Sequence, residues 1–107
     1  MAAVDISRSA APAQLRLPVP DDLDIATADR LVRAAERLLA ERPRQLVLDF
    51  ARVGLCDAAG LGALARIRLA CRPVGCALVL VNVNPRVRWV IRLVGMDRLL
   101  AVEGPPA

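Results

Sequence analysis

The sequence predicts a single α/β domain, in which buried strands alternate with amphipathic helices. Two nearly all-apolar runs, 45–50 and 77–83, have the length and composition of strands covered on both faces. The segments around them carry apolar residues at helical spacing, the arrangement that gives parallel crossovers. The chain has 107 residues, 56% of them hydrophobic, which is the length of one domain and enough apolar mass for a core.

Two short strands and a helix are expected before the first buried strand. The strands span 3–7 and 14–19, and prolines in the second one indicate an edge position. Thr27 is the expected N-cap of a helix over 28–42 that Pro43 ends. Its buried face should consist of Leu31, Val32, Ala35, Leu38 and Leu39.

Two more helices are expected after that strand. Asp57 precedes a helix over 58–72, whose buried residues should be Leu61, Leu64, Ala65 and Leu69. Asn84 and Pro85 are a strong helix start, because an N-cap is followed by proline at the first helical position. Val87, Val90, Ile91 and Val94 should face inward before Gly95 ends that helix. One further helical turn over 96–100, an edge strand at 101–102 and a tail over 103–107 complete the order β-β-α-β-α-β-α.

Several residue types that catalysis depends on are absent. The chain has no His, Tyr or Lys, and its only hydroxyl side chains are Ser7, Ser9 and Thr27. These absences exclude Ser-His and Cys-His nucleophile pairs, Schiff bases and a phosphate-loop lysine. With one Phe and one Trp, little is available to stack nucleobases. We therefore expect a binding module rather than an enzyme, with no cofactor and no metal.

The charge pattern argues against a nucleic-acid site and against a membrane span. All 15 cations are arginine, and the net charge is +4, but the arginines occur on every expected helix among 11 carboxylates, as on solvated faces. The longest stretch without charge runs only from Pro73 to Pro85, shorter than the roughly 20 residues of a membrane-spanning helix. The three cysteines form no disulfide framework, and the N-terminus has no signal-peptide pattern. Together these features predict a cytoplasmic protein.

Five segments together resemble a known family. They are Leu23-Asp-Ile-Ala-Thr-Ala28, Leu46-Val-Leu-Asp-Phe50, Cys56-Asp-Ala-Ala-Gly-Leu-Gly62, Leu80-Val-Asn-Val-Asn-Pro-Arg-Val87 and Leu93-Val-Gly-Met-Asp-Arg-Leu-Leu100. Their order and spacing resemble the STAS domain of bacterial anti-sigma-factor antagonists, over residues 12–102. The resemblance implies one STAS domain over 1–107, with a mixed β-sheet of four to five strands and three to four α-helices.

The resemblance also implies a partner and a phosphorylation switch. Members of the family bind an anti-sigma factor that is also a serine kinase of the histidine-kinase-like ATPase type, and this binding releases a sigma factor. Their switch motif reads Asp-Ser-(Ser/Thr)-Gly-Leu, and the second hydroxyl residue takes the phosphate. Here Asp57, Gly60 and Leu61 match the motif, but Ala58 and Ala59 replace the hydroxyl pair. Since Ala59 cannot be phosphorylated, we expect a protein whose binding is independent of phosphorylation.

The partner surface that the resemblance implies consists of two neighbouring loops. Its residues are Asp24, Thr27, Asp57, Ala58, Ala59, Gly60 and Leu61. Asp57 can act as an N-cap, as a partner contact or as both. An acid/base pair of Asp24 with Asp57 is a weaker alternative, because no other catalytic group accompanies it.

Other residues have both a structural and a functional interpretation. Cys56 is either a small buried residue or a redox switch at a helix N-terminus. Arg88 and Trp89 either form a second partner patch or cover the sheet edge. Gly60 and Gly62 alone are weak evidence for a phosphate cradle.

Three other functions and a homodimer remain as alternatives. The same fold occurs as an accessory subunit of lipid or anion transporters, and it can serve as a scaffold in a sensing assembly. A nucleic-acid binder would lose affinity steeply with added salt.

Overall fold

The computed structural model describes residues 11–106 and contains a four-stranded sheet with three α-helices. The strands are β1 (Gln14–Pro18), β2 (Gln45–Asp49), β3 (Ala77–Val81) and β4 (Ala101–Val102). The helices are α2 (Ala28–Leu39), α3 (Ala58–Cys71) and α4 (Pro85–Leu93), with short 3-10 turns at Arg72–Val74 and Met96–Arg98. The predicted alternation of strands and helices is thus confirmed from 14 onward, whereas the strand expected over 3–7 lies outside the described residues.

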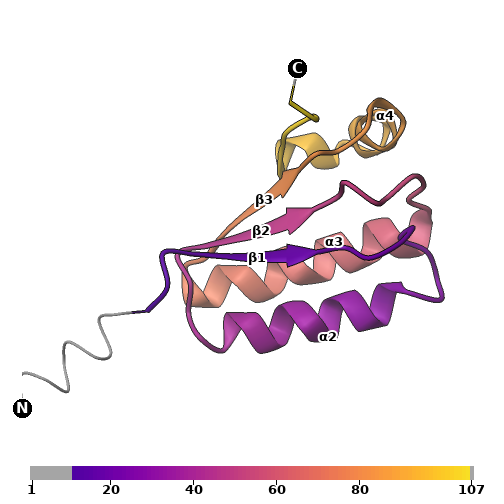
Figure 1. Ribbon diagram of the computed structural model, residues 1–107. Coiled ribbons are helices and arrows are strands. Elements are labelled where there is room, and N and C mark those ends of the chain that lie inside the picture. Colours follow the sequence, from indigo (N-terminus) through magenta and orange to yellow (C-terminus); the bar gives the residue numbers. More distant parts are fainter. Residues whose placement is uncertain (1–10, 107) are drawn as a thin grey trace, which may run out of the picture.

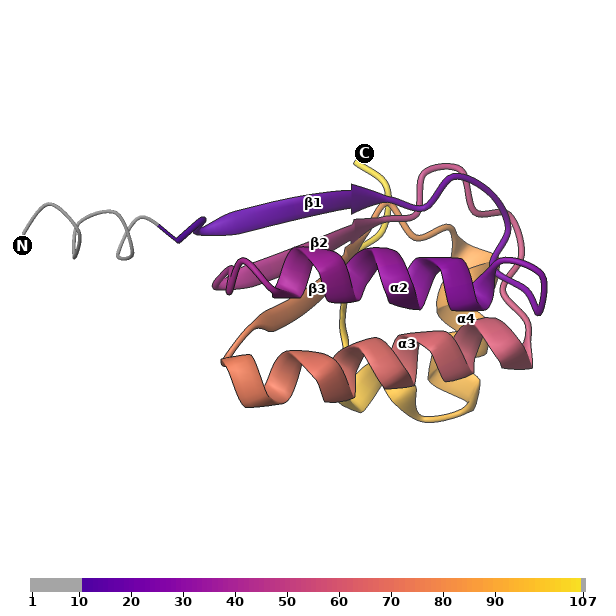
Figure 2. The same ribbon diagram turned by 90° about the horizontal axis from the view of Figure 1, so that it is seen from below.

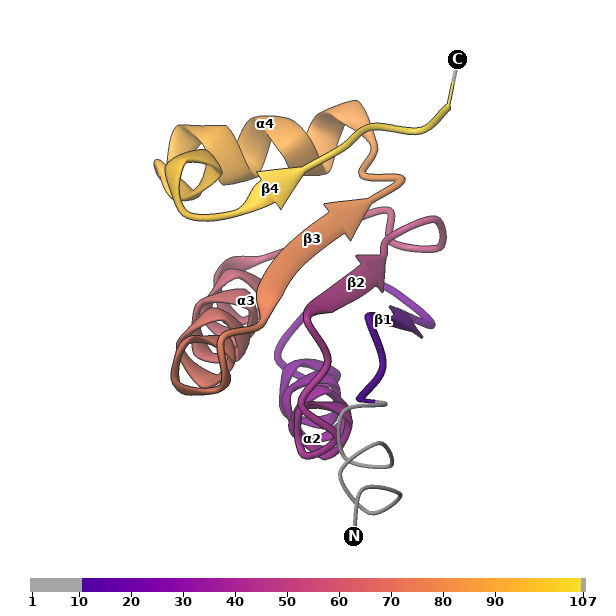
Figure 3. The same cartoon turned by 90° about the vertical axis from the view of Figure 1, so that its left-hand side faces the viewer.

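All three strand pairings are parallel, in the order β1-β2-β3-β4. The sheet described here is therefore parallel rather than mixed, and its strand number is at the lower end of the expected range. β1 lies at one edge, as Pro18 predicts. Figure 1 shows β1, β2 and β3 running in one direction, and Figure 3 shows β4 running the same way beside β3, so that the loops after β1, β2 and β3 gather at one end of the domain.

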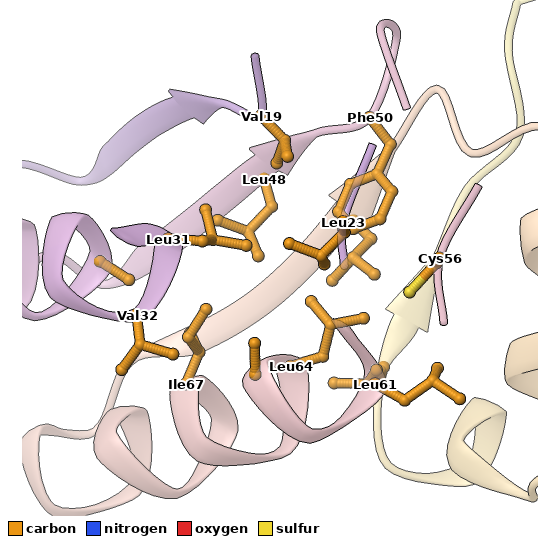
Figure 4. Packing of buried hydrophobic residues seen from close by; sticks show 14 of the residues in the cluster. Val19, Leu23, Leu31, Val32, Leu48, Phe50, Cys56, Leu61, Leu64 and Ile67 are labelled. Atoms are coloured by element: carbon orange, nitrogen blue, oxygen red, sulfur yellow. The ribbon is translucent and has the colours of Figure 1, made fainter. Parts of the chain in front are cut away.

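Helices α2 and α3 cover one face of the sheet and lie side by side (Figure 2). Their buried residues pack against β1 and β2 in one continuous hydrophobic core. Leu23, Leu48 and Leu64 meet near the centre of this core, as Figure 4 shows. Helix α4 lies apart from the other two helices, next to β3 and β4 (Figure 3), and contributes Val87 and Ile91 to the same core.

Some element boundaries and inward-facing residues differ from the expectation. α2 ends at Leu39 rather than 42, because the chain turns at Arg42 with a positive φ of 54°. β3 ends at Val81 rather than 83, since Asn82 has a φ of 58°, which breaks the strand. Two residues expected to be buried are exposed: Leu69 on α3 (59%) and Val94 after α4 (53%).

Candidate functional site

Helix α3 begins directly after Asp57, which is its N-cap. The Gly60 amide donates a hydrogen bond to Asp57 Oδ1 at 3.0 Å, and this bond satisfies one of the amides that a helix start leaves unpaired. The capping interpretation is therefore confirmed. The Asp57 side chain remains exposed, so a second role as a partner contact stays open.

The loop before α2 lies against the loop before α3. Leu23 and Cys56 form a parallel bridge. Around it, the Leu23 amide donates to the Leu55 carbonyl at 3.0 Å, and the Asp57 amide donates to the Leu23 carbonyl at 3.1 Å. These bonds extend the sheet by one short step, so the two loops predicted to form one surface are neighbours.

Asp22 joins the two loops. Its Oδ1 accepts hydrogen bonds from the Gly54 amide at 2.7 Å and the Leu55 amide at 3.0 Å. The sequence alone does not reveal this role of Asp22, because its partners Gly54 and Leu55 lie on a distant segment of the chain. Two amide donors on one carboxylate oxygen fix the loop spacing more tightly than backbone pairing alone.

Asp24 and Thr27 stabilise the turn that leads into α2. The amides of Ala26 and Thr27 donate to Asp24 Oδ1 at 2.9 and 3.1 Å. Thr27 occupies the N-cap position of α2, but its hydroxyl makes no cap bond to the helix. It donates instead to the Asp22 carbonyl at 2.8 Å, which corrects the expectation of a capping hydroxyl.

Gly60 lies at a close approach between α3 and the loop that carries Leu23. A Cβ atom at this position would lie 2.4 Å from the Leu23 carbonyl oxygen and 2.8 Å from Cys56 Sγ. Neither distance is compatible with a methyl group, and the carbonyl belongs to the backbone. Gly60 therefore serves close packing, and its motif position does not by itself indicate a phosphate cradle.

The predicted site residues divide into surface and core positions. Asp57 and Ala58 are exposed, Asp24, Thr27 and Ala59 are partly buried, and Gly60 and Leu61 are buried. Gly60 and Leu61 thus lie beneath the exposed residues and support them through packing.

Two exposed apolar side chains on the same loops were missed. Ile25 is 83% exposed and Leu55 is 53% exposed. Their sequence neighbours carry no signal for this exposure, because Ile25 precedes Ala26 and Leu55 lies between Gly54 and Cys56. The exposure depends on the pairing of the two loops. We call Asp24, Ile25, Leu55, Asp57 and Ala58 the α3-entry surface.

Cys56 is buried beneath the α3-entry surface. Burial, together with the negative charge of Asp57, raises the pKa of its thiol to about 11. At neutral pH the side chain is thus a thiol and not a reactive thiolate. This favours the small buried residue over the redox switch.

The two residues of the secondary patch point in different directions. Trp89 is 58% exposed. Arg88 is partly buried and covers Gly104, where a Cβ atom would lie 2.8 Å from an Arg88 guanidinium nitrogen. Arg88 therefore packs against the C-terminal segment, and of these two residues only Trp89 extends into solvent.

Residues 11–106 contain neither a metal-ligand cluster nor a helix that could span a membrane. In this part of the chain, no group of three Cys, Asp or Glu side chains is arranged to hold a metal ion. No helix there has the length and apolar character needed to cross a bilayer.

Known proteins match most of this chain in sequence pattern or in structure. The family model STAS_2, described as the Mlab, STAS domain, matches residues 6–101. A sulfate transporter family protein of Wolinella succinogenes has a TM-score of 0.76 at 23% identity, covering 85% of this chain and 76% of that chain. No curated protein matches the sequence.

Two anti-sigma factor antagonists are similar in structure. A protein of Thermotoga maritima assigned to this class has a TM-score of 0.76 at 20% identity, covering 85% of this chain and 79% of that one. Unphosphorylated SpoIIAA of Bacillus, whose phosphorylated form is also known, has a TM-score of 0.68 at 20% identity, covering 83% of this chain and 78% of its own. At these identities the likeness establishes a shared fold.

Proposed function

Because the chain belongs to the STAS domain family, we propose that it is a non-enzymatic binding module of the anti-sigma-factor antagonist type. It binds an anti-sigma factor or a related histidine-kinase-like ATPase in the bacterial cytoplasm and thereby regulates transcription. The structural likeness to two anti-sigma factor antagonists supports this class of partner. The observation that carries the proposal is the α3-entry surface, where exposed apolar and acidic side chains lie together.

The composition of this surface supports recognition of a protein. Ile25 and Leu55 expose apolar area to water, and this exposure does not stabilise the monomer. Asp57 and Asp24 lie beside them, so the surface combines an apolar centre with an acidic margin, the usual arrangement of a protein interface. The loops beneath are held by the Asp22 and Leu23 hydrogen bonds, so little ordering cost accompanies binding.

The first residues of α3 offer no hydroxyl that a kinase could phosphorylate. Ala58 and Ala59 have no hydroxyl, and the Thr27 hydroxyl is engaged by the Asp22 carbonyl. A phosphate at the start of α3 would add negative charge and three acceptor oxygens beside Asp57. Without it the α3-entry surface keeps one chemical form, so binding is controlled by the amount of protein or by the partner.

The positions of the two carboxylates support a role without catalysis. Asp57 holds the start of α3, and Asp24 holds the turn before α2. Neither lines the groove of about 630 Å³ between β1 and α2. Both carboxylates act on the backbone, which makes an acid/base pair the weaker hypothesis.

The test is affinity purification from the native cytoplasm, followed by quantitative binding with the partner that mass spectrometry identifies. Asp57→Lys should weaken binding at least tenfold, because it replaces one of the two carboxylates of the surface with a cation. Glu41→Lys is the matched control, since Glu41 is exposed beyond the far end of α2. Equal affinities of both variants and the wild type, with intact circular dichroism, would remove the α3-entry surface from the proposal.

A second candidate is an accessory STAS subunit of a lipid or anion transporter. The likeness to the sulfate transporter family protein favours it. The same purification decides between the two candidates, because a transporter-type ATPase would be recovered in place of a sigma-regulating protein.

A further inference from the structure

The outer face of α4 carries apolar side chains that the core does not use. With about 100° per residue, Val87 and Ile91 point into the core, and Trp89 projects roughly opposite to their mean direction. Leu93 follows one turn later on the same side. Trp89 is 58% and Leu93 is 66% exposed, and neither belongs to the hydrophobic core.

Trp89 differs in its exposure from the other aromatic side chain of the protein. The sequence contains one Phe, one Trp and no Tyr. Phe50 is almost fully buried, so the larger of the two aromatic side chains is the one left outside. Trp89 has an apolar body and a polar indole N–H, a combination suited to a boundary between apolar and wet surroundings.

The charge on the same face has one sign. α4 contains Arg86, Arg88 and Arg92 and no acidic residue. Arg88 is turned toward Gly104, whereas Arg86 and Arg92 are exposed and flank Trp89 by roughly 60° on either side of the helix. Among residues 11–106, the salt bridges are Arg16 with Asp49 and Arg66 with Asp29, so neither flanking arginine forms a salt bridge there, although Asp97 lines the same hollow as Arg92.

The exposed apolar side chains and the positive charge on the outer face of α4 favour some binding partners over others. A second copy of the chain that docked by the same face would bring like charges together at Arg86 and Arg92. A protein partner needs roughly 800 Å² on each side for a stable interface, more than the outer face of a nine-residue helix offers. A lipid surface needs no concave complement, accepts Trp and Leu at the headgroup boundary, and attracts arginine when it is anionic.

We propose that the outer face of α4 is a docking surface for an anionic lipid bilayer. Trp89 and Leu93 enter the interfacial layer, while Arg86 and Arg92 contact lipid phosphates. The association is peripheral and reversible, because two apolar side chains and two cations are a small anchor. It is independent of the α3-entry surface, which lies on the loops before α2 and α3.

Trp89 itself reports the contact, since it is the only Trp in the chain and there is no Tyr. The full-length protein is titrated with vesicles of phosphatidylcholine containing phosphatidylglycerol, and separately with vesicles of phosphatidylcholine alone. Anionic vesicles should shift Trp89 emission to shorter wavelength, and high salt should reverse the shift. No shift with either vesicle, or an equal shift with both, would overturn the proposal. A shift produced by poly-glutamate but not by anionic vesicles would overturn it in favour of an acidic protein.

Paired variants then locate the contact by vesicle co-sedimentation. Arg86→Glu/Arg92→Glu should lower the apparent affinity for anionic vesicles roughly tenfold or more. Arg33→Glu/Arg37→Glu on exposed positions of α2 changes the net charge equally and should have a much smaller effect. Leu93→Ala should weaken binding, whereas Leu69→Ala, an exposed leucine of α3, should not. Equal losses within each pair would show attraction by net charge alone and contradict the assignment to α4.

Discussion

Gly60 determines how closely α3 can approach the loop that carries Leu23. The space for its missing side chain is already filled by the Leu23 carbonyl oxygen and Cys56 Sγ. Because the carbonyl is held in the bridge between the two loops, it cannot move without disturbing the α3-entry surface. The glycine of the motif therefore has a packing role in this chain, whatever partner binds above it.

Two glycines of α3 should respond oppositely to alanine. Gly60→Ala should lower the free energy of unfolding by about 1–3 kcal/mol through overpacking. Gly62→Ala should raise it by about 0.5–1 kcal/mol, because Gly62 lies within the helix with no atom near its Cβ position. Urea denaturation of both variants measures these two changes in the free energy of unfolding. A Gly60→Ala protein as stable as the wild type would contradict the close packing.

The cap at Asp57 can be separated from its charge. Asp57→Ala should cost about 1 kcal/mol of stability, because the Gly60 amide loses its acceptor. Asp57→Asn keeps an acceptor oxygen and should remain within a few tenths of a kcal/mol of the wild type. Thermal or urea denaturation checks the difference, and equal destabilisation by both variants would show that charge rather than capping stabilises the helix start.

At the scale of elements, Asp49 connects three strands at the carboxyl end of the sheet. Asn82 Nδ2, after β3, donates to Asp49 Oδ1 at 3.0 Å, and an Arg16 guanidinium nitrogen of β1 lies 2.8 Å from Oδ2. The Asn82 bond, the Arg16 bond and the Ala51 amide lower the pKa of this carboxyl to about 2. The positive φ of Asn82 places its side chain at the end of β3, where it contacts β2.

Stability should therefore fall on acidification through this group. The folded-state pKa lies below the unfolded value, so the contribution is complete above about pH 4 and is lost as the pH falls toward 2. It amounts to at most about 2 kcal/mol. Urea denaturation across this range should show wild type and Asp49→Asn converging at low pH. Parallel pH profiles would contradict the network.

The start of α4 was predicted correctly from the sequence, whereas the buried face of α3 was predicted only in part, and the reasons are physical. Asn84 and Pro85 were correctly placed at the start of α4, because both signals act within one turn. α3 was harder, since it is apolar on nearly every side and its periodicity does not distinguish a buried face. Leu69 was consequently assigned to the core, whereas Ile67, which is buried, was not.

The candidate site was predictable only where the signal is local. The Asp57 cap and the loss of hydroxyls at Ala58 and Ala59 follow directly from the sequence. Asp22, Ile25 and Leu55 did not, because their roles depend on a contact between distant segments. Their importance becomes visible once Leu23 and Cys56 are paired.

At the scale of the whole molecule, the parallel sheet brings the loops after β1 and β2 to one end, while α4 lies beside β3 and β4 (Figures 1 and 3). The protein thus has a mixed apolar and acidic surface on the loops and a basic, apolar surface on α4. Because these two surfaces differ in chemistry and lie on different elements, the domain could contact a protein partner and, as proposed above, an anionic lipid bilayer independently of each other.

The central claim is that the α3-entry surface binds a partner without any phosphorylation step. Its most direct test is the equilibrium affinity of the purified partner for Ala58→Glu. Ala58 is exposed in the first turn of α3, where a carboxylate favours the helix, so this variant should fold at least as well as the wild type. Ala40→Glu, at the exposed far end of α2, is the matched control.

We predict that Ala58→Glu binds at least tenfold more weakly than the wild type with an unchanged or higher denaturation midpoint, while Ala40→Glu binds normally. Wild-type affinity of Ala58→Glu would contradict the account.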